Sequence, residues 1–319
     1  MASASAGTVI GRYVVLETLG SGGMGTVLRA YDPKLHREVA LKRLRAGSFE
    51  AEASARLVRE AQALAQLSHP NVISVYDVEP TPDDVIVALE LVRGATLGRW
   101  LRTPRTWREV VQVLVQAGRG LAAAHDANLI HRDFKPANVM ISEQGQVKVM
   151  DFGLAKVRVT EDASESDAAR EDARVHLRHP EALEAAPSIT TRADVVLGTP
   201  PYMAPEQHVG TAASPSVDQY AFCVTLWSSL TGERPFHGDA DMDALLRAKL
   251  EGPPPWPRSC AAPRRVVDAI RRGLAADPRA RWPDMQALLE QLELALRRRR
   301  SRWRSLAGAA LLGGGVFAG

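Results

Sequence analysis

The chain has 319 residues, 45% of them hydrophobic, which is enough to bury a sizeable core in one large two-lobed domain or in two smaller domains. It carries 40 Lys and Arg against 37 Asp and Glu, but six of the arginines lie within residues 297–304, and removing them leaves 34 basic against 37 acidic residues. This balance excludes the basic surface of a nucleic-acid-binding protein from the body of the chain.

The first residues and the two cysteines indicate where the protein works. Residues 1–9 form a short tail whose start, Met1–Gly7, has neither the basic nor the apolar region of a signal peptide, so we expect no export. Cys223 and Cys260 lie in no metal-binding or disulfide spacing, which fits a reducing cytoplasm, and we expect Cys223 in the core.

A glycine-rich loop follows the first long predicted strand. Residues 13–19 lead into Gly20, Gly22 and Gly25, and residues 26–31 form the next strand, so the loop is the turn of a hairpin. A dinucleotide-binding fold needs a helix after this loop and a P-loop needs a Gly-Lys-Ser/Thr ending, so both are disfavoured. The glycine N–H groups can lie over phosphates, although such a loop alone could equally be a flexible surface hairpin.

A lysine and a glutamate downstream form a candidate ion pair. Lys42 lies on the apolar face of the predicted strand 38–44, where a lysine needs a partner. Glu60 lies at the edge of the apolar stripe of a predicted helix, residues 55–67. The stripe consists of Leu57, Ala61, Leu64 and Ala65. We expect Lys42 to pair with Glu60; the alternative is a solvated Glu60 among neighbouring arginines.

A predicted strand at 85–92 is followed by a break at 93–96, which we interpret as the hinge into a helical half of the chain. The predicted helix 109–125 has apolar residues at core spacing and leads the chain to His131. Because an apolar residue precedes His131, we expect a packed core histidine rather than a general base.

Two short apolar runs, residues 138–141 and 146–150, predict a β-hairpin with a glycine in its turn. A hairpin returns its ends to one place, so Asn138 and Asp151 should face each other as oxygen ligands suited to Mg²⁺. Asp133 lies five positions before Asn138 and is the candidate base.

The remainder predicts one long loop and then helices. Residues 156–192 interleave acidic residues with Ala, Ser and Arg, with almost no large apolar side chain, so we expect a mobile loop. A buried helix begins near Val217 and stops at Thr231 and Gly232, with Asp218 in its first turn, where it can accept backbone N–H groups. Residues 266–275 and 285–297 predict two more amphipathic helices.

These motifs together resemble a bacterial, eukaryotic-like (Hanks-type) serine/threonine protein kinase. The order of glycine loop, Val-Ala-Leu-Lys, helix Glu, His-Arg-Asp with Asn, Asp-Phe-Gly and Ala-Pro-Glu is very specific and spans roughly residues 10–296. The resemblance implies an α+β, two-lobed fold, with a small β-rich N-lobe at 10–92 that has one key helix and a larger, mainly helical C-lobe at 93–296.

The resemblance also implies ATP and Mg²⁺, with Mn²⁺ as an alternative metal, and protein substrates with Ser/Thr acceptors. Asp133 would take the proton of the acceptor hydroxyl, Lys135 would steady the γ-phosphate and Lys42 would hold the α- and β-phosphates. The residues implied to bind nucleotide are Gly20, Gly22, Gly25, Val27, Ala40, Lys42, Glu60, Glu90, Val92, Asn138 and Asp151, of which Asn138 and Asp151 hold the metal. Lys135 together with Thr199 resembles the Ser/Thr-specific pattern.

Other positions are similar to structural features of the family. Glu206 and Arg281 resemble the ion pair of the large lobe, and Asp218 resembles the residue that braces the catalytic loop. Phe134 stands where Leu is usual, which changes packing volume rather than chemistry. The loop from Asp151 to Glu206 is longer than is usual, and the resemblance assigns no role to its insert.

Arg132, directly before Asp133, is typical of kinases whose activation loop is ordered by phosphorylation, because a phosphate can pair with this arginine. We expect self-phosphorylation at Thr190 or Thr191, with Ser188 less favoured.

The chain ends in a basic segment, residues 297–305, and an apolar, glycine-rich run, residues 306–319. The run is shorter than the roughly 20 residues of a spanning helix, yet arginines beside an apolar run are typical of the cytoplasmic edge of a membrane. A short anchor, a peripheral membrane contact through Arg297–Gly319 and a disordered tail all stay open. The kinase domain is expected in the cytoplasm, at the inner face of the membrane if the tail attaches.

Two other functions compete with this one. A pseudokinase scaffold would bind nucleotide or partners without transfer, but its usual mark is a lost Lys, Asp or Asn, and Lys42, Asp133 and Asn138 are all present. A kinase of small molecules is disfavoured by residues 198–206, which resemble a platform for protein substrates.

Overall fold

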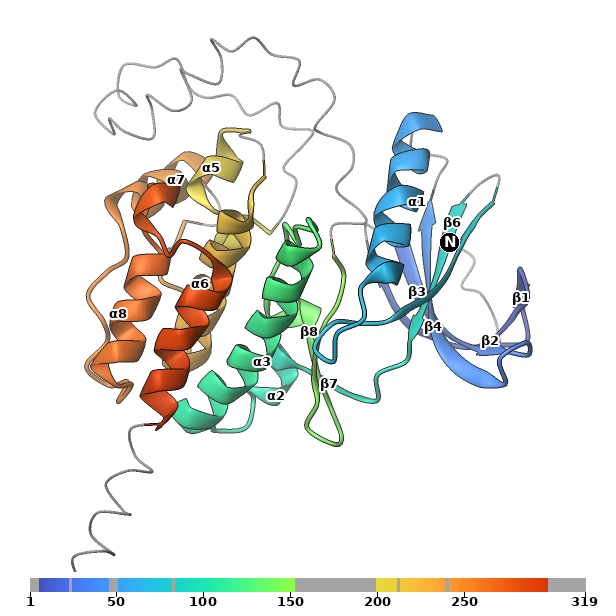
Figure 1. Ribbon diagram of the computed structural model, residues 1–319, viewed down its shortest axis with the longest axis horizontal. Helices are drawn as coiled ribbons and strands as arrows, with labels where there is room; N and C mark the ends of the chain where they lie inside the picture. Colours follow the sequence, from blue (N-terminus) through green and yellow to red (C-terminus); the bar gives the residue numbers. More distant parts are fainter. Residues whose placement is uncertain are drawn as a thin grey trace, which may run out of the picture.

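The N-terminal lobe is built on an antiparallel sheet with the strand order β1-β2-β3-β4-β6-β5 (Figure 1). The computed structural model describes residues 6–22, 25–45, 51–81, 84–152, 199–210, 213–238 and 241–297. The strands are β1 (Val9–Ile10), β2 (Tyr13–Gly22), β3 (Gly25–Asp32), β4 (Arg37–Arg45), β5 (Val75–Pro80) and β6 (Asp84–Glu90).

The two faces of this sheet belong to two apolar clusters. On β6, Val85, Val87 and Leu89 join the large core that continues into the other lobe, whereas Ile86 and Ala88 join a separate cluster on the opposite face. This division follows from the two-residue period of a strand. The sheet therefore has one face for the interlobe core and one for a small core of its own.

Helix α1 (Ala51–Gln66) lies beside β5 and β6 and covers the interlobe face of the sheet (Figure 1). Leu57, Ala61 and Leu64 are buried, as the apolar stripe predicts. The fourth member of the predicted stripe, Ala65, is exposed, because the stripe ends at Leu64 before the helix does. Glu60 is half-buried at the stripe's edge, as predicted.

The C-terminal lobe is mainly helical, so the predicted two-lobed α+β fold is confirmed. Its helices are α2 (Leu97–Trp100), α3 (Trp107–Asp126), α5 (Pro205–His208), α6 (Pro215–Thr231), α7 (Met242–Glu251), α8 (Arg264–Gly273) and a last helix at residues 285–297. Short 3₁₀ turns lie at η2 (Pro136–Asn138), η5 (Pro200–Tyr202) and η6 (Pro278–Ala280). The two amphipathic helices predicted near the end of the chain are present as α8 and 285–297.

Local sequence signals explain where the two central helices begin and end. A capping box of Thr106 and Glu109 starts α3 two residues before the predicted position. Helix α6 stops at Gly232, which adopts φ 82°, a left-handed conformation that glycine takes without steric cost. α6 packs against α3 and α8, and its Cys223 is buried in the core as predicted.

The predicted break at 93–96 is more ordered than expected. Residues 94–96 form β7 (Gly94–Thr96), which pairs with β8 (Val139–Ser142) and through it with β9 (Val147–Val149). A Cβ on Gly94 would overlap the Ile141 carbonyl oxygen, so this pairing requires glycine. The segment after the hinge is thus fixed to the sheet that carries the candidate site.

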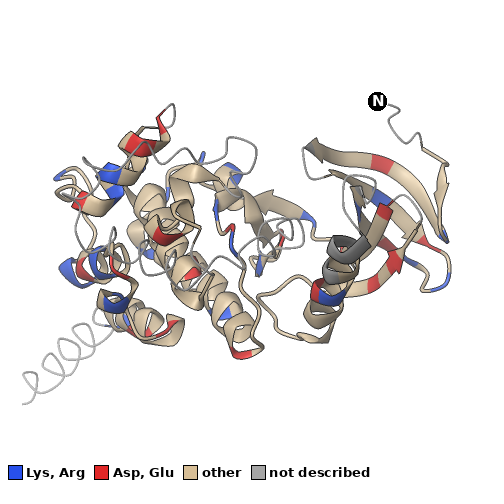
Figure 2. Ribbon diagram, turned by 90° about the horizontal axis from the view of Figure 1, so that it is seen from above, with Lys and Arg blue, Asp and Glu red and all other residues tan. Residues whose placement is uncertain are grey.

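Charged residues of both signs are interspersed over both lobes (Figure 2), in agreement with the near-neutral balance of the sequence. Within the described part of the chain, no helix is long and apolar enough to cross a membrane.

Candidate active site

The segment around Asp133 is held by a buried aspartate from another helix. Asp218 on α6 is fully buried and accepts the backbone N–H groups of His131 at 2.7 Å and Arg132 at 2.8 Å. It also bonds His125 Nε2 at 2.8 Å. Arg132 adopts φ 64°, which is rare for a residue with a side chain. The carboxylate therefore stabilises a strained turn next to Asp133, as the family resemblance implies. It accepts N–H groups of the segment at His131 and Arg132, rather than those of the first turn of its own helix, which the helix pattern predicted.

His131 is a core residue, as predicted. Its ring is fully buried between Phe134, at a centroid distance of 5.9 Å, and Phe152, at 4.7 Å. Nε2 lies 2.8 Å from the Met150 carbonyl oxygen, and Nδ1 accepts the Asp133 N–H at 3.3 Å, so the proton belongs on Nε2. Burial lowers the pKa of His131, which keeps the ring neutral.

A carboxylate, an ammonium and a hydroxyl converge at the centre of the site. Lys135 Nζ donates to Asp133 Oδ2 at 2.8 Å and to Thr199 Oγ1 at 2.6 Å. Thr199 in turn donates to Asp133 Oδ1 through its N–H at 3.2 Å and its hydroxyl at 3.1 Å. The structure thus brings Thr199 to Asp133 and Lys135, although Thr199 follows them by 66 and 64 positions in the chain.

The predicted hairpin after this segment is present. β8 and β9 pair in antiparallel register, and Gly145 turns the chain with φ 80°. The Met150 N–H donates to the Asn138 carbonyl oxygen at 2.9 Å. Met150 therefore lies opposite Asn138, and Asp151 is the next residue. Asn138 Nδ2 donates to the Asp133 carbonyl oxygen at 2.9 Å. The amide nitrogen is therefore used to fix the loop, and Oδ1 is the atom of Asn138 suited to a metal.

These oxygens fit a magnesium ion that is shared with phosphates. Asn138 offers one amide oxygen and Asp151 one carboxylate, and Mg²⁺ is usually held by one or two carboxylates together with substrate phosphates. Asp151 is 39% exposed at its side chain, so the carboxylate is open to a ligand. Among the described residues, no three His, Cys, Asp or Glu side chains gather into a metal site of their own.

The predicted partner of Lys42 is wrong in this structure. Lys42 Nζ pairs with Asp151 Oδ1 at 2.8 Å, whereas Glu60 Oε1 lies 3.8 Å from a guanidinium nitrogen of Arg132. The strand pattern correctly puts Lys42 on a buried face, and burial requires a counter-charge. Lys42 and Glu60 of the N-lobe each pair with a residue of the C-lobe, and side-chain periodicity does not determine which residue that is.

The remaining predicted nucleotide residues lie along β2, β3, β4 and the end of β6. Gly22 pairs with Gly25 across the hairpin turn, and a Cβ on Gly25 would overlap the Arg43 carbonyl oxygen, so the turn needs glycine there. Glu90 ends β6 and its carboxylate pairs with Lys148 of β9 at 2.8 Å. This ion pair connects the end of the N-lobe sheet to the sheet of the C-lobe. The rest of the set, Gly20, Val27, Ala40 and Val92, lies on these strands or directly after them.

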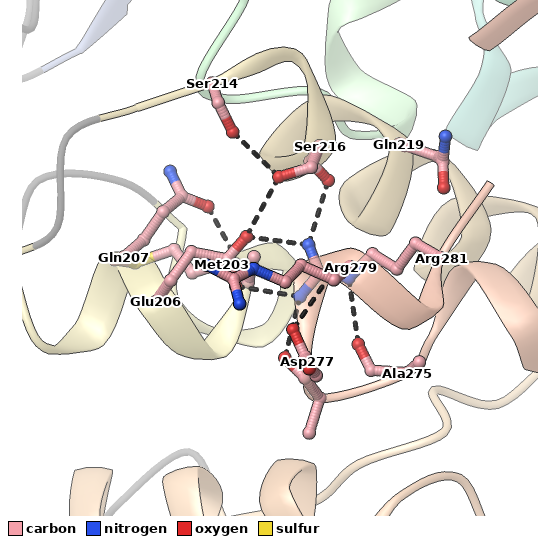
Figure 3. Close-up of polar contacts among 12 residues, drawn as sticks. Met203, Glu206, Gln207, Ser214, Ser216, Gln219, Ala275, Asp277, Arg279 and Arg281 are labelled. Atoms are coloured by element: carbon pink, nitrogen blue, oxygen red, sulfur yellow. Dashed lines mark hydrogen bonds and ion pairs between the residues drawn. The ribbon is translucent and has the colours of Figure 1, made fainter. Parts of the chain in front are cut away.

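The predicted ion pair of the large lobe is confirmed (Figure 3). Arg281 donates to Glu206 through two nitrogens, at 2.6 and 2.8 Å, with both side chains buried. The same guanidinium donates to the carbonyl oxygens of Ser216 at 3.0 Å and Ala275 at 2.8 Å. The pair therefore connects the start of α5 to the start of α6 and to the loop after α8.

One residue near the site was missed in the sequence. Lys249 on α7 is fully buried and donates to the carbonyl oxygens of Pro200 at 2.6 Å and Met203 at 2.8 Å, and to His208 Nε2 at 2.9 Å. Burial, and then the charge of Lys249, lowers the pKa of His208 to about 3. A signal existed, because Lys249 follows Leu245 by four residues and so shares the buried face of α7.

Several predictions fall on residues outside those described. They are the insert at 156–192, the acceptors Ser188, Thr190 and Thr191, and the tail beyond Arg297. They stay predictions.

Comparison with known proteins agrees with this geometry. Serine/threonine-protein kinase PknA of Mycobacterium tuberculosis is 36% identical over 283 residues, covering 86% of this chain and 59% of PknA. Serine/threonine-protein kinase PrkC of Bacillus subtilis is 32% identical over 286 residues, covering 88% of this chain and 40% of PrkC. The chain thus spans at most 59% of the length of these two relatives.

A solved structure has the same fold. The kinase domain of M. tuberculosis PknI superposes with a TM-score of 0.65 at 24% identity, covering 91% of this chain and 99% of that domain. Residues 13–292 also match the family described as the protein kinase domain. Because this match takes in most of the sequence, the chain belongs to the protein kinase domain family.

Proposed function

We propose that the protein is an ATP-dependent serine/threonine protein kinase, which transfers the γ-phosphate of Mg-ATP to Ser or Thr hydroxyls of proteins. The observation that carries the proposal is the meeting of Asp133, Lys135 and Thr199 at hydrogen-bond distances. A base and a cation side by side are what phosphoryl transfer to a hydroxyl requires.

Asp133 acts as the base in this proposal. The Thr199 hydroxyl, 3.1 Å from Asp133 Oδ1, marks a position from which a hydroxyl can donate to this carboxylate. The acceptor oxygen forms a bond to the γ-phosphorus while the bond from that phosphorus to the bridging oxygen of ADP breaks, and the acceptor's proton goes to Asp133. Lys135 lies beside Asp133 and neutralises charge on the migrating phosphoryl group.

Lys42 serves the phosphates of the nucleotide in the proposed reaction. Lys42 lies on β4 opposite Val27 of β3, and its ammonium is paired with Asp151 in this structure. We propose that the α- and β-phosphates compete with Asp151 for Lys42, which frees the carboxylate for the metal. Gly20, Gly22 and Gly25 offer backbone N–H groups to the phosphates. Asn138 and Asp151 would hold the metal, which would neutralise phosphate charge.

The adenine site belongs to the same proposal. Val27 on β3 and Ala40 on β4 line the base, and the backbone of Glu90 and Val92 offers it hydrogen bonds. The Glu90–Lys148 ion pair supports this arrangement, because it holds the connecting segment against the C-lobe.

A transfer assay tests the proposed function. Purified protein is incubated with labelled ATP and Mg²⁺, alone and with a generic basic protein, and compared with Asp133→Asn, Lys42→Met and the control Asp268→Asn on the exposed face of α8. We expect label in the wild type and the control, and loss of label in the other two variants. Label that persists undiminished in Asp133→Asn and Lys42→Met would refute the assigned roles. Nucleotide binding without any transfer would support a pseudokinase instead.

Self-phosphorylation at Thr190 or Thr191 and membrane contact through Arg297–Gly319 are part of the proposal, and both rest on the sequence. Phosphopeptide mapping after incubation with ATP tests the first. Co-sedimentation of the full chain with anionic lipid vesicles, compared with a chain ending at Leu296, tests the second.

A further inference from the structure

A cavity of about 740 Å³ opens beside the proposed catalytic carboxylate. Its described lining comes from three segments: residues 96–102 on and around α2, residues 135–137 of the catalytic loop, and Tyr202. Lys135 belongs to both the cavity wall and the site, because its Nζ is bonded to Asp133 and to Thr199. A chain segment that presents a hydroxyl to Asp133 would therefore continue past this cavity.

The cavity wall is basic. Arg99 and Arg102 are both exposed, lie three residues apart and line the cavity together with Lys135, and no acidic side chain belongs to the described lining. A site of 300–1,000 Å³ is of the size that encloses a small ligand or a few side chains.

The guanidinium groups of Arg99 and Arg102 differ from those of nearby arginines in having no partner within the described residues. Arg105 lies over the Trp100 ring, Arg108 donates to the Leu296 carbonyl oxygen, and Arg119 pairs with Glu293 at 2.7 Å. No hydrogen bond, ion pair or ring contact of a described residue uses the guanidinium of Arg99 or Arg102. The fold therefore uses the nearby arginines and leaves these two facing the cavity.

We propose that this cavity forms a substrate groove, which selects protein substrates with Asp or Glu close to the acceptor Ser or Thr. The acidic side chain would bind Arg99 and Arg102. A guanidinium binds a carboxylate through two parallel hydrogen bonds, which gives geometric selectivity as well as charge. Because both arginines lie on the α2 side of Asp133, acidic residues are favoured on one flank of the acceptor. This inference rests on the proposed function and names its substrate class.

Synthetic peptides test the groove. The parent peptide has one Thr in an uncharged background. Each of six further peptides has a single Asp, at one of the three positions before or the three positions after the Thr. An exposed ion pair contributes up to about 1 kcal/mol, so one favourable Asp should raise kcat/KM by about 5-fold, through KM, at one or more positions on one flank. The gain should fall at high salt, where exposed charges are screened.

Variants assign the effect to the groove. In the double variant Arg99→Gln/Arg102→Gln, the ratio of kcat/KM between the best Asp peptide and the uncharged peptide should fall to near one. In Arg99→Glu/Arg102→Glu it should fall below one, and Lys in place of Asp should be favoured. Arg264→Gln, an exposed arginine of α8, is the matched control and should keep the wild-type ratio.

The outcomes separate this inference from the proposed function. Wild-type protein that phosphorylates uncharged and acidic peptides equally well is a kinase without the proposed groove specificity. An acidic preference that survives unchanged in both double variants would equally overturn the inference. If no peptide and no protein accepts phosphate from the wild type, the proposed function itself fails, and the groove specificity with it.

Discussion

The replacement Asp218→Asn tests whether a buried carboxylate holds the catalytic loop in its working geometry. Asp218 accepts two backbone N–H groups, at 2.7 and 2.8 Å, and His125 Nε2 at 2.8 Å, with no exposure to solvent. An amide of the same shape keeps one acceptor oxygen and turns an NH₂ group toward the other donors. The variant loses at least one charge-assisted hydrogen bond, which is worth about 1.5–3 kcal/mol, and it leaves a buried donor unsatisfied.

We expect Asp218→Asn to lower the free energy of unfolding by about 3 kcal/mol, measured by urea denaturation. The loss also allows Arg132 to leave φ 64°, a conformation that costs about 1–3 kcal/mol to hold. As the loop relaxes, Asp133 leaves its position, and we expect kcat to fall about 100-fold, or about 2.7 kcal/mol. The exposed Asp268→Asn on α8 is the control and should change stability by less than about 0.5 kcal/mol.

A matched pair at Arg132 isolates the backbone. Arg132→Ala and Arg132→Gly both remove the guanidinium, but glycine adopts a positive φ freely, so the glycine variant should be more stable by about 1 kcal/mol. In the Asp218→Asn background this difference should shrink. If Asp218→Asn is unstable yet keeps kcat within about 2-fold, the idea that Asp218 positions the loop is refuted.

Three further predictions concern the large lobe. Glu206→Gln leaves Arg281 buried with a neutral partner and should cost about 3–5 kcal/mol of unfolding free energy, whereas the exposed Glu233→Gln should cost almost nothing. Burial lowers the pKa of folded His208 to about 3, so as pH falls below about 6.5 the unfolded state binds this proton and the folded state does not. Between pH 7 and 5 the free energy of unfolding of the wild type should therefore fall by about 2 kcal/mol more than that of His208→Gln. Equal losses in the two proteins would exclude this titration. Lys249→Met removes the donor to Pro200 and Met203 and should raise the KM for peptide by about 10-fold while the KM for ATP stays constant; a change in both would indicate general unfolding.

Most of the fold could be predicted from the sequence, because it depends on local signals. The turn at Gly145 and the stop of α6 at Gly232 use positive φ angles that glycine permits. The hairpin then places Asn138 and Asp151 at one end without further information. His131 was predicted to be a core residue from its apolar neighbour, and its burial against two phenylalanines agrees.

The contacts that could not be predicted are choices among partners of similar chemistry. β7 was missed because three residues carry too little periodicity to distinguish a strand from a break. Lys42 pairs with Asp151 and not with the predicted Glu60, and this pairing depends on how the two lobes approach each other, which no local pattern encodes.

Lys249 illustrates the same limit in the large lobe. Helical spacing shows that its side chain faces inward, but a lysine can be satisfied by a carboxylate, by carbonyl oxygens or by a neutral histidine, and all of these give the same sequence pattern. The contacts seen are two carbonyl oxygens of the segment that follows Thr199 and the ring of His208. Because Thr199 bonds Asp133, this buried ammonium holds the segment that follows Thr199 close to the proposed catalytic carboxylate. If Asp133 is the base, as proposed, α7 also affects how a substrate is held, although Lys249 lies far from Asp133 in the sequence.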